Sequence, residues 1–446
     1  LIPLVFLIIS LGYTIRCTEA SPHIPIIISG MLAACVAMFA LNYEWSTILE
    51  GILETIKSSM EAALILLIIG MVVGSWIISG VVPTMIFYGL KIMDPSIFLP
   101  ATVLLSLIAA IATGSSWSTA ATIGIALMGV GAGLGIPAPI TVGAIISGAY
   151  MGDKLSPLSD TTNLAPAMAG SNLFDHIKSM LATTIPAFII TMIIFTFMGM
   201  KYSEIEVDAS ILDSILSTLT SEFTITPILF IVPIITIGLV VKKVPAIPGL
   251  LFGSIMGGVV AIFVQKVSLR DFVTALQVGY VSNSGNQMVD DLLTRGGMNS
   301  MVSTVALIIC SLFLGGVMER TGMLNAIAMK IMSIANSTGS LILSTLLTAF
   351  AVNMLAAEQY LSIVITGRIF KDVYRERNLD PVTLSRALED SGTMTSPLIP
   401  WNTCGAYMIA TLGIAPWVYV PYCFMNLISP VISCIYGYTG FTIKYL

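Results

Sequence analysis

Charged residues are scarce in this chain. Asp, Glu, Lys and Arg together make up only 10% of the 446 residues, whereas hydrophobic residues make up 56%. Soluble globular domains carry about 25% charged residues. The composition therefore excludes an ordinary soluble domain, and no nucleic-acid partner is expected.

Histidine is also scarce, and cysteine pairs are absent. The two histidines, His23 and His176, are far apart, and none of the six cysteines forms a Cys-x-x-Cys pair. Both facts argue against a structural metal site. The sequence contains no His-Glu-x-x-His, no Gly-x-Ser-x-Gly and no cofactor fingerprint. We therefore expect a protein that is not an enzyme and that needs no cofactor.

The chain has long apolar runs instead. Residues 62–78, 185–200 and 225–241 each approach the roughly 20 apolar residues that cross a bilayer as an α-helix. These runs predict an all-α polytopic membrane protein embedded in the lipid bilayer.

A pattern of turn residues occurs twice along the chain. Most matched segments are separated by 240 to 242 positions, but the first pair is separated by 223. The change predicts an insertion in the second half, within 281–298. Duplication of a very apolar chain is typical of secondary transporters. The matched segments are Ser79-Gly80 with Thr321-Gly322, Pro139-Ile140-Thr141 with Pro381-Val382-Thr383, Ser156-Pro157-Leu158 with Ser396-Pro397-Leu398, and Ile24-Pro25 with Ile247-Pro248.

This duplication defines the expected organisation. We expect a first transmembrane repeat at 1–200, a polar linker at 201–224 and a second repeat at 225–446. Each repeat should contain about five transmembrane helices, a re-entrant hairpin and a broken helix. Because five crossings are an odd number, the second repeat should enter from the opposite side, which gives two inverted-topology repeats. The expected hairpins are 97–134 and 339–371, the broken helices are 138–168 and 382–412, and an interfacial helix is expected at 44–60.

Basic residues are distributed unequally between the two sides of this arrangement. The side of the C-terminus carries eleven and the other side six, and cytoplasmic loops are enriched in Lys and Arg. We therefore expect a multi-pass protein of the cytoplasmic (inner) cell membrane with both termini in the cytoplasm. The eleven are Lys57, Lys178, Lys242, Lys243, Arg320, Lys330, Arg368, Lys371, Arg375, Arg377 and Lys444, and the six are Arg16, Lys91, Lys201, Lys266, Arg270 and Arg295.

Polar groups occur inside the most apolar neighbourhoods. Backbone that leaves a helix at membrane depth must be buried in protein or line a cavity, and ionisable residues there are costly and usually functional. Pro157 disrupts a helix, and Gly148 and Gly152 should loosen the turns before it, which would free carbonyl oxygens. The polar segments are 113–119, 152–163, 353–359 and 389–403.

The oxygen atoms of these segments suit a hard alkali cation, because hydroxyls, amides, freed carbonyls and a carboxylate can replace the water around sodium. A carboxylate that binds either a proton or sodium would exchange the two by competition. The expected carboxylates are Asp153, Asp160, Glu358 and Asp390, and sodium itself is expected at Asp153, Asp160, Thr161 and Asn163. The expected neutral ligands are Ser116, Ser118, Thr119, Thr161, Asn163, Thr393, Ser396, Asn402 and Thr403.

These residues also have structural alternatives. Asp153 and Lys154 could neutralise each other, Asp160 could cap a half-helix, and Arg386 could pair with one of the two acidic residues that follow it. The serines could be small residues that permit close helix packing. Lys154 is also a candidate countercharge for an organic anion.

Three motifs are long and specific: Gly114-Ser115-Ser116-Trp117-Ser118-Thr119, Gly152-Asp153-Lys154-Leu155-Ser156-Pro157-Leu158-Ser159-Asp160-Thr161-Thr162-Asn163, and Glu389-Asp390-Ser391-Gly392-Thr393 with Pro400-Trp401-Asn402-Thr403. Together they resemble the NhaC family of sodium/proton antiporters, part of the ion transporter superfamily. The resemblance covers nearly the whole chain and implies an inverted repeat, paired hairpins, sodium coupling and a homodimer. It does not fix the substrate, because some members are similar to malate–lactate antiporters and other relatives move amino acids.

The first hypothesis is a sodium/proton antiporter that works by alternating access, with Na+ and H+ as coupling ions that compete for intramembrane carboxylates. The alternative is a sodium-coupled carrier or exchanger of a small organic acid, such as malate or lactate, or of an amino acid.

Overall fold

The computed structural model describes residues 2–14, 22–202, 209–242 and 244–446. Within these residues the chain is helical, with two isolated β-bridges and no strand. Seven described helices are long and apolar enough to cross a membrane, or up to nine if two bent pairs are counted as spans. The predicted all-α polytopic membrane protein is confirmed. The basic residues Arg16 and Lys243 and part of the expected linker, 203–208, lie outside the described residues.

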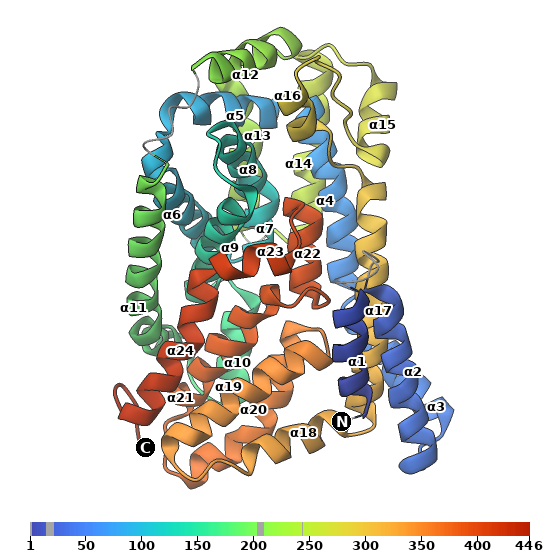
Figure 1. The fold of residues 1–446 in the computed structure, drawn as a ribbon, viewed down its shortest axis with the longest axis vertical. Helices are drawn as coiled ribbons and strands as arrows, with labels where there is room; N and C mark the ends of the chain where they lie inside the picture. Colours follow the sequence, from blue (N-terminus) through green and yellow to red (C-terminus); the bar gives the residue numbers. More distant parts are fainter. Residues whose placement is uncertain (1, 15–21, 203–208, 243) are drawn as a thin grey trace.

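One group of helices combines the early segments of both halves (Figure 1). Helix α17 packs against α2 and α3, and α4 packs against α14 and α15. This group occupies the right side of Figure 1. Its helices are α1 (Ile2–Tyr13), α2 (His23–Ala40), α3 (Trp45–Ser58), α4 (Met60–Ile78), α14 (Ala246–Phe263), α15 (Leu269–Val278) and α17 (Val302–Arg320).

A second group contains the expected hairpins and broken helices. Helix α9 packs along α6, α11 also packs on α6, α24 packs on α19, and α10 packs on α20. The helices are α6 (Pro95–Thr113), α9 (Ala138–Leu155), α10 (Asp160–Ala169), α11 (Leu173–Met200), α19 (Thr338–Leu355), α20 (Gln359–Glu376), α21 (Pro381–Leu388) and α24 (Phe424–Thr439). The polar segments of the sequence therefore lie in this second group.

Gly148 and Gly152 have a packing role in α9. Both are buried within the helix, and a Cβ on Gly148 would lie 2.2 Å from the carbonyl oxygen of Val103 in α6. A Cβ on Gly152 would lie 2.4 Å from that of Leu107. The two glycines therefore let α6 and α9 approach closely. The expectation that they loosen the turns before the break was wrong.

Both predicted hairpins are present as helix–turn–helix elements. The first consists of α6, a left-handed turn at Gly114, and a continuous helix made of α7 (Ser116–Thr119), the π-helical turn Ala120–Gly124 and α8 (Ile125–Gly133). The second consists of α19 and α20, joined at Ala356–Glu358. Figure 1 places α8 in the upper half of the molecule and α20 in the lower half.

Both predicted broken helices are also present. Residues 156–159 separate α9 from α10. In the second half, α21 passes into the π-helical turn Glu389–Thr393 and the 3-10 turn Ser396–Leu398 before α22 (Thr403–Leu412) begins. These breaks lie at the Ser-Pro-Leu motifs that the two halves share.

Helix caps recur at a constant separation of 243 positions. Asp94 caps α6 and Ser337 caps α19, Ser115 caps α7 and Glu358 caps α20, and Ser159 caps α10 and Asn402 caps α22. Gly170 and Gly413 end α10 and α22 in left-handed conformations. The two halves therefore share local structure beyond the matched sequence motifs.

Two of the short helices that were not predicted follow left-handed glycines. Helix α5 (Val81–Ile92) follows the left-handed Gly80, and α18 (Met323–Met332) follows the left-handed Gly322. They lie at opposite ends of Figure 1. The expected polar linker also contains a helix, α12 (Ala209–Glu222), followed after a bend of 84° by α13 (Ile231–Val241).

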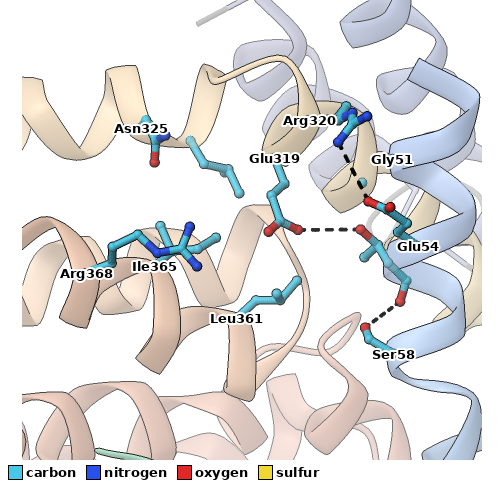
Figure 2. Close-up of a pocket in the computed structure, with 12 residues that line it drawn as sticks. Gly51, Glu54, Ser58, Glu319, Arg320, Asn325, Leu361, Ile365 and Arg368 are labelled. Atoms are coloured by element: carbon cyan, nitrogen blue, oxygen red, sulfur yellow. Dashed lines mark hydrogen bonds and ion pairs between the residues drawn. The ribbon is translucent and has the colours of Figure 1, made fainter. Parts of the chain in front are cut away.

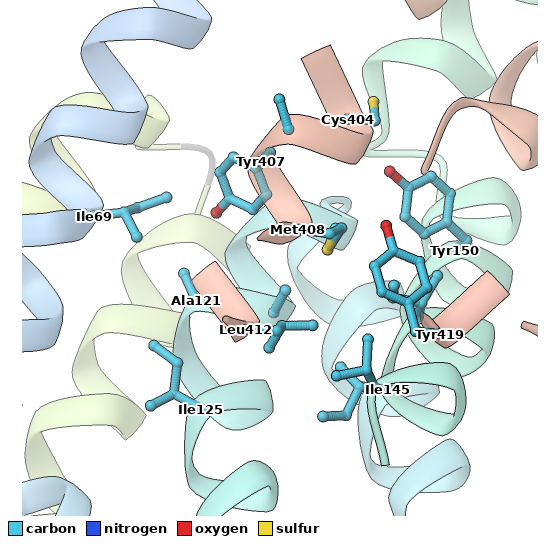
Figure 3. Packing of buried hydrophobic residues seen from close by; sticks show 14 of the residues in the cluster. Ile69, Ala121, Ile125, Ile145, Tyr150, Cys404, Tyr407, Met408, Leu412 and Tyr419 are labelled. Atoms are coloured by element: carbon cyan, nitrogen blue, oxygen red, sulfur yellow. The ribbon is translucent and has the colours of Figure 1, made fainter. Parts of the chain in front are cut away.

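Helix α22 packs in the centre of the core, where aromatic and aliphatic side chains surround it. Figure 3 shows Tyr407, Met408 and Leu412 between Ile69 of α4 on one side and Ile145 of α9 on the other. Two further helical pieces, α16 (Gln287–Leu293) and α23 (Pro416–Tyr419), complete the described helices of the second half. The core thus connects the two groups of helices through α22.

The predicted insertion packs against α4. The backbone N–H of Gly297 donates to the carbonyl of Gly70 at 2.7 Å. Outside the spans, Asp290 of α16 accepts hydrogen bonds from Ser282 and Ser284, and these bonds lower the pKa of its carboxyl below the usual value. The segment is therefore an ordered cover on the upper end of α4.

Gly74 should be among the positions least tolerant of a larger side chain. Its Cβ would lie 2.2 Å from the backbone oxygen of Ala275, so Gly74→Ala should cost about 1–3 kcal/mol through overpacking. Gly238→Ala is the matched control, because nothing lies within 4 Å of the added methyl in α13. Thermal unfolding of the purified proteins in detergent measures the difference. Equal melting temperatures for both variants would contradict the described packing of α15 on α4.

Candidate functional site

The first hairpin tip binds the carboxylate at the end of α9. The backbone N–H and the hydroxyl of Ser116 donate to Asp153 Oδ2 at 3.0 and 2.7 Å. Asp153 is buried and lies at the N-terminus of the continuous helix that α7 begins. Unpaired N–H groups and the helix dipole favour a negative charge there. The structure thus brings Asp153 and Ser116 together, and the two Ser116 donors favour the ionised form of the carboxylate.

The other hydroxyl groups of this tip form hydrogen bonds within the tip. Thr119 donates to the carbonyl of Ser115 at 3.0 Å, and the backbone N–H of Ser118 donates to the Ser115 hydroxyl. Trp117 stacks on Tyr407 of α22 with ring centroids 4.0 Å apart, and the Tyr407 hydroxyl donates to the Trp117 carbonyl. These contacts hold the tip against α22. Ser118 and Thr119 are buried beside the site, but no described hydrogen bond joins them to Asp153.

The second hairpin tip repeats this arrangement with its own carboxylate. Glu358 Oε2 accepts from the backbone N–H groups of Tyr360 and Leu361 at 2.6 and 3.1 Å. Its other oxygen accepts from the Thr403 hydroxyl at 3.3 Å. Glu358 is buried and caps α20. Each tip therefore holds one carboxylate at a helix N-terminus with one hydroxyl donor.

Asn402 and Thr403 lie at the second tip, as the start of α22. The backbone N–H of Thr403 donates to the carbonyl of Ala357 at 2.9 Å. Asn402 caps α22 and donates to the Asn353 side chain at 3.2 Å. Ser396 donates to Gln359 Oε1 at 3.2 Å. Three of the predicted neutral ligands are therefore within one or two contacts of Glu358.

Lys154 pairs with Asp390, which lies 236 positions away. Both side chains are fully buried, and the ammonium bonds directly to Asp390 Oδ1. Thr183 and Ser429 also donate to that oxygen, at 3.1 and 2.8 Å. The alternative in which Lys154 neutralises Asp153 is therefore not the one observed. The pair connects the end of α9 to the π-helical turn of the second broken helix.

Arg386 does not form the ion pair that the sequence suggested. Its guanidinium donates to the Thr442 hydroxyl at 3.1 Å near the C-terminus. Among the described residues, neither Glu389 nor Asp390 forms an ion pair with Arg386.

Asp160 and Asn163 are exposed on the first turn of α10. Ser159, rather than Asp160, caps this helix, and Asn163 donates to the carbonyls of Pro157 and Ser159 at 3.0 and 2.7 Å. Thr161 is buried and lies 3.2 Å from the Ser159 hydroxyl. Asp160 still interacts electrostatically with Asp153. The four residues predicted to hold sodium therefore divide into a buried pair and an exposed pair.

Two acidic or aromatic residues near the site were missed as functional candidates. Glu389 was part of a predicted polar segment and of the family motif but was not chosen as an ion-binding residue, yet it is fully buried and interacts with the Thr393 and Thr161 hydroxyls. Tyr360 is 40% exposed two residues after the buried Glu358, and it interacts electrostatically with Glu358 and Asp160. The adjacency of Glu389 to Asp390 in a polar segment was the sequence signal for the first. Nothing in the sequence indicated the second.

A cavity of about 360 Å³ opens between the two groups of helices (Figure 2). Leu361, Ile365 and Arg368 form one wall on α20, and Thr55 and Glu319 lie opposite, on α3 and α17. Arg320 at its edge pairs with Glu50 at 2.5 Å. Because the N–H of Leu361 also bonds Glu358, the inner wall of the cavity lies beside the second tip.

The Lys154–Asp390 pair makes a direct stability prediction. Lys154→Met or Asp390→Leu alone leaves the other charge buried without its counterion, which should cost about 3–5 kcal/mol. The double variant removes both charges and should recover most of that loss. Unfolding of the three purified variants in detergent measures the coupling. Additive losses in the double variant would contradict a direct pair.

Comparisons with known proteins agree with these features. Residues 148–441 match the model of the Na+/H+ antiporter family. The chain is 37% identical to the Na+/H+ antiporter NhaC of Alkalihalophilus pseudofirmus, with 95% of this chain and 91% of that protein covered. It is 39% identical to NhaC of Bacillus subtilis, covering 94% and 93%. It is also 36% identical to the malate-2H+/Na+-lactate antiporter of Bacillus subtilis, covering 99% and 94%.

Proposed function

The chain belongs to the Na+/H+ antiporter family, and we propose that Na+ and H+ compete for its buried tip carboxylates during alternating access. It is a secondary active sodium/proton antiporter of a multi-pass, helical type. The observation that carries the proposed site is the matched pair of tips. Asp153 and Glu358 each lie at a helix N-terminus, where a broken helix from the same half of the chain meets a hairpin.

The carboxylates at the two hairpin tips can bind either Na+ or H+, so that the two cations compete. A helix N-terminus stabilises a carboxylate anion, and a buried anion in turn attracts either of the two cations that can neutralise it. Among the described residues, no three His, Cys, Asp or Glu side chains gather as a metal-ligand set. The Ser116 and Thr403 hydroxyls, which bond the two tip carboxylates, would complete the sodium shell. Sodium is the transported ion at this site, and a proton on the same oxygen would displace it.

The duplication supports an inverted relation between the halves. The caps at 243-position separation give each half the same hairpin and the same broken helix. The first hairpin reaches the centre from the upper end of Figure 1 and the second from the lower end. Two tips that approach one site from opposite ends provide a gate for each side, which is what alternating access requires.

The cavity beside α20 is the proposed opening toward the cytoplasm. It lies between α20 and the α3–α17 contact, and its wall extends toward Glu358 through Leu361. The basic residues Lys330, Arg368 and Arg375 lie on α18 and α20, at the lower end of Figure 1. By the positive-inside rule this end faces the cytoplasm of the cell.

Ion flux in proteoliposomes tests the function. With an imposed proton gradient and an internal pH dye, external sodium should collapse the gradient and choline should not. Asp153→Asn should abolish this exchange while the protein still inserts, because the amide cannot carry the charge that sodium or a proton neutralises. Asp175→Asn, at an exposed position in the first turn of α11, is the matched control and should behave as wild type. Exchange at the wild-type rate in Asp153→Asn would show that the first hairpin tip is not part of the ion-binding site.

A second candidate function is supported by the malate–lactate relative. Sodium-coupled movement of a small organic acid would need a cation for the carboxylate, and Lys154 was the sequence candidate. In this conformation the Lys154 ammonium is bonded to Asp390 and is not free to bind an organic acid. This favours the sodium/proton antiporter. If sodium alone leaves the gradient intact but malate, lactate or an amino acid triggers flux, this second function replaces the first.

Thiol labelling tests the opening. In a cysteine-free background that retains transport, Leu361→Cys should react with a charged methanethiosulfonate reagent applied from the cytoplasmic side, and labelling should block exchange. Ile189→Cys is the control, because this exposed residue lies in the middle of the apolar helix α11, where a charged reagent cannot follow. Labelling of Leu361→Cys only from the opposite side would reverse the proposed orientation.

A further inference from the structure

Helix α22 contacts both hairpin tips. Its Thr403 hydroxyl donates to Glu358 of the second tip at 3.3 Å. Four positions later, the Tyr407 ring stacks on Trp117 of the first tip with an interplanar angle of 22°, and its hydroxyl donates to the Trp117 carbonyl at 2.7 Å. Residues four positions apart are neighbours on one face of a helix. One face of α22 therefore connects the two tips.

The Trp117 carbonyl lies just before an irregular part of its own helix. The π-helical turn Ala120–Gly124 begins three residues later, and such turns replace the regular i→i−4 hydrogen bonds by longer-range ones. A side chain can bond the backbone where the regular pattern is interrupted. The Tyr407 side chain, which is fully buried, does so here. Tyr407 thus fixes both the ring and the backbone of Trp117.

The position of Trp117 decides the position of Ser116. Ser116 comes directly before Trp117, and its N–H and hydroxyl donate to Asp153 at 3.0 and 2.7 Å. The planar peptide bond between the two residues transmits any displacement of one to the other. Hydrogen bonds weaken once the donor and acceptor separate beyond about 3.2 Å. The Ser116–Asp153 contact therefore depends on where Tyr407 holds the tip.

The duplicated fold does not itself require this contact. At the separation of 243 positions that relates the helix caps, Tyr360 corresponds to Trp117 and Leu164 of α10 corresponds to Tyr407. A leucine has neither a ring that can stack nor a hydroxyl that can donate, and Tyr360 is exposed. The Trp117–Tyr407 contact is therefore an addition to the shared architecture, and it is made at the first tip.

We propose that Tyr407 is a positioning residue for sodium binding, because it holds Trp117 and thereby keeps the Ser116 donors on Asp153. This inference rests on the proposed antiport function and adds a residue that acts through another. Without the Tyr407 hydroxyl the tip loses one of its two attachments to this side chain. Sodium then meets a less ordered site and fills it only at a higher concentration, while the filled site is transported at the same rate.

The dependence of sodium-driven proton flux on sodium concentration, measured in proteoliposomes, tests the inference. Tyr407→Phe removes the hydroxyl and keeps the ring. We expect the half-saturating sodium concentration to rise about 2- to 10-fold, the usual effect of one lost hydrogen bond, with the maximal rate unchanged. Tyr407→Leu, which introduces the residue found at the repeat position, removes both attachments and should raise this concentration at least as far.

Tyr374→Phe is the matched control. Tyr374 is also buried, and its hydroxyl lies 3.0 Å from that of Thr345. It lies near the end of α20 that is remote from the second tip. This variant loses a comparable hydrogen bond and should keep the wild-type half-saturating concentration.

A double variant tests the route through Ser116. If Tyr407 acts by placing the Ser116 donors, Tyr407→Phe and Ser116→Ala together should raise the half-saturating sodium concentration by less than the product of their separate effects. A rise equal to that product overturns the inference, because the two residues would then act independently.

The single variants discriminate further. An unchanged half-saturating concentration in Tyr407→Phe, an equal rise in Tyr374→Phe, or a smaller rise in Tyr407→Leu than in Tyr407→Phe overturns the inference and leaves the antiport function intact. A fall in the maximal rate alone also overturns it, because Tyr407 would then act on transport or folding. Absence of sodium-driven proton flux in the wild type overturns the proposed function itself.

Calorimetric titration of the purified protein with sodium chloride in detergent gives a readout that does not depend on transport. Tyr407→Phe should raise the Kd for sodium, and Tyr374→Phe should leave it at the wild-type value. A Kd that is the same in Tyr407→Phe and the wild type overturns the inference.

Discussion

Charge placed inside an apolar helical bundle has to be neutralised locally, and the centre of this protein follows from that constraint. The cost of an unpaired buried ion is several kcal/mol or more. The structure meets it in three ways. Lys154 and Asp390 neutralise each other, Asp153 and Glu358 lie at helix N-termini, and Glu389 interacts with the hydroxyls of Thr393 and Thr161. Buried carboxylates of this kind are the basis of the exchange that we propose.

The helix N-termini exist at membrane depth because helices break there. A hairpin that stops at Gly114 or Ala357 exposes N–H groups that a continuous helix would use internally. In each half, the neighbouring broken helix brings its own end to the same place, so that Ser116 meets Asp153 and Thr403 meets Glu358. The buried ion pair then joins the two halves, since Lys154 comes from the first and Asp390 from the second. One duplicated element thus builds both sides of the centre.

Much of the fold could be predicted from local signals. Prolines and glycines indicated both helix breaks and the first hairpin turn, because these residues act on the backbone at their own position. The pattern of turn residues that occurs twice indicated the duplication. The short helices α5 and α18 were missed because about ten apolar residues after a glycine do not distinguish a helix from a loop. The close α6–α9 packing was missed for a related reason. The need for Gly148 and Gly152 is set by Val103 and Leu107, which only the folded chain brings near.

The residue types of the candidate site could be predicted from the sequence, but the contacts between them could be predicted less well. Asp153, Glu358 and Thr403 were chosen because polar residues at membrane depth are costly, and that argument needs no tertiary structure. The choice of each side chain's partner, by contrast, depends on the tertiary structure. Lys154 finds its counterion 236 positions away, and Glu389 is distinguished from Asp390 only by what surrounds each side chain. The exposure of Asp160 likewise depends on the direction in which α10 leaves the break.

The central claim is that sodium and protons exclude each other at this cluster of carboxyl groups. It can be measured without a membrane. Sodium chloride is added to the purified protein in a weakly buffered detergent solution that contains a pH dye, with choline chloride as the reference. The account predicts that sodium binding releases protons and that choline releases none. Sodium that binds without proton release, or equal release with both salts, would contradict it.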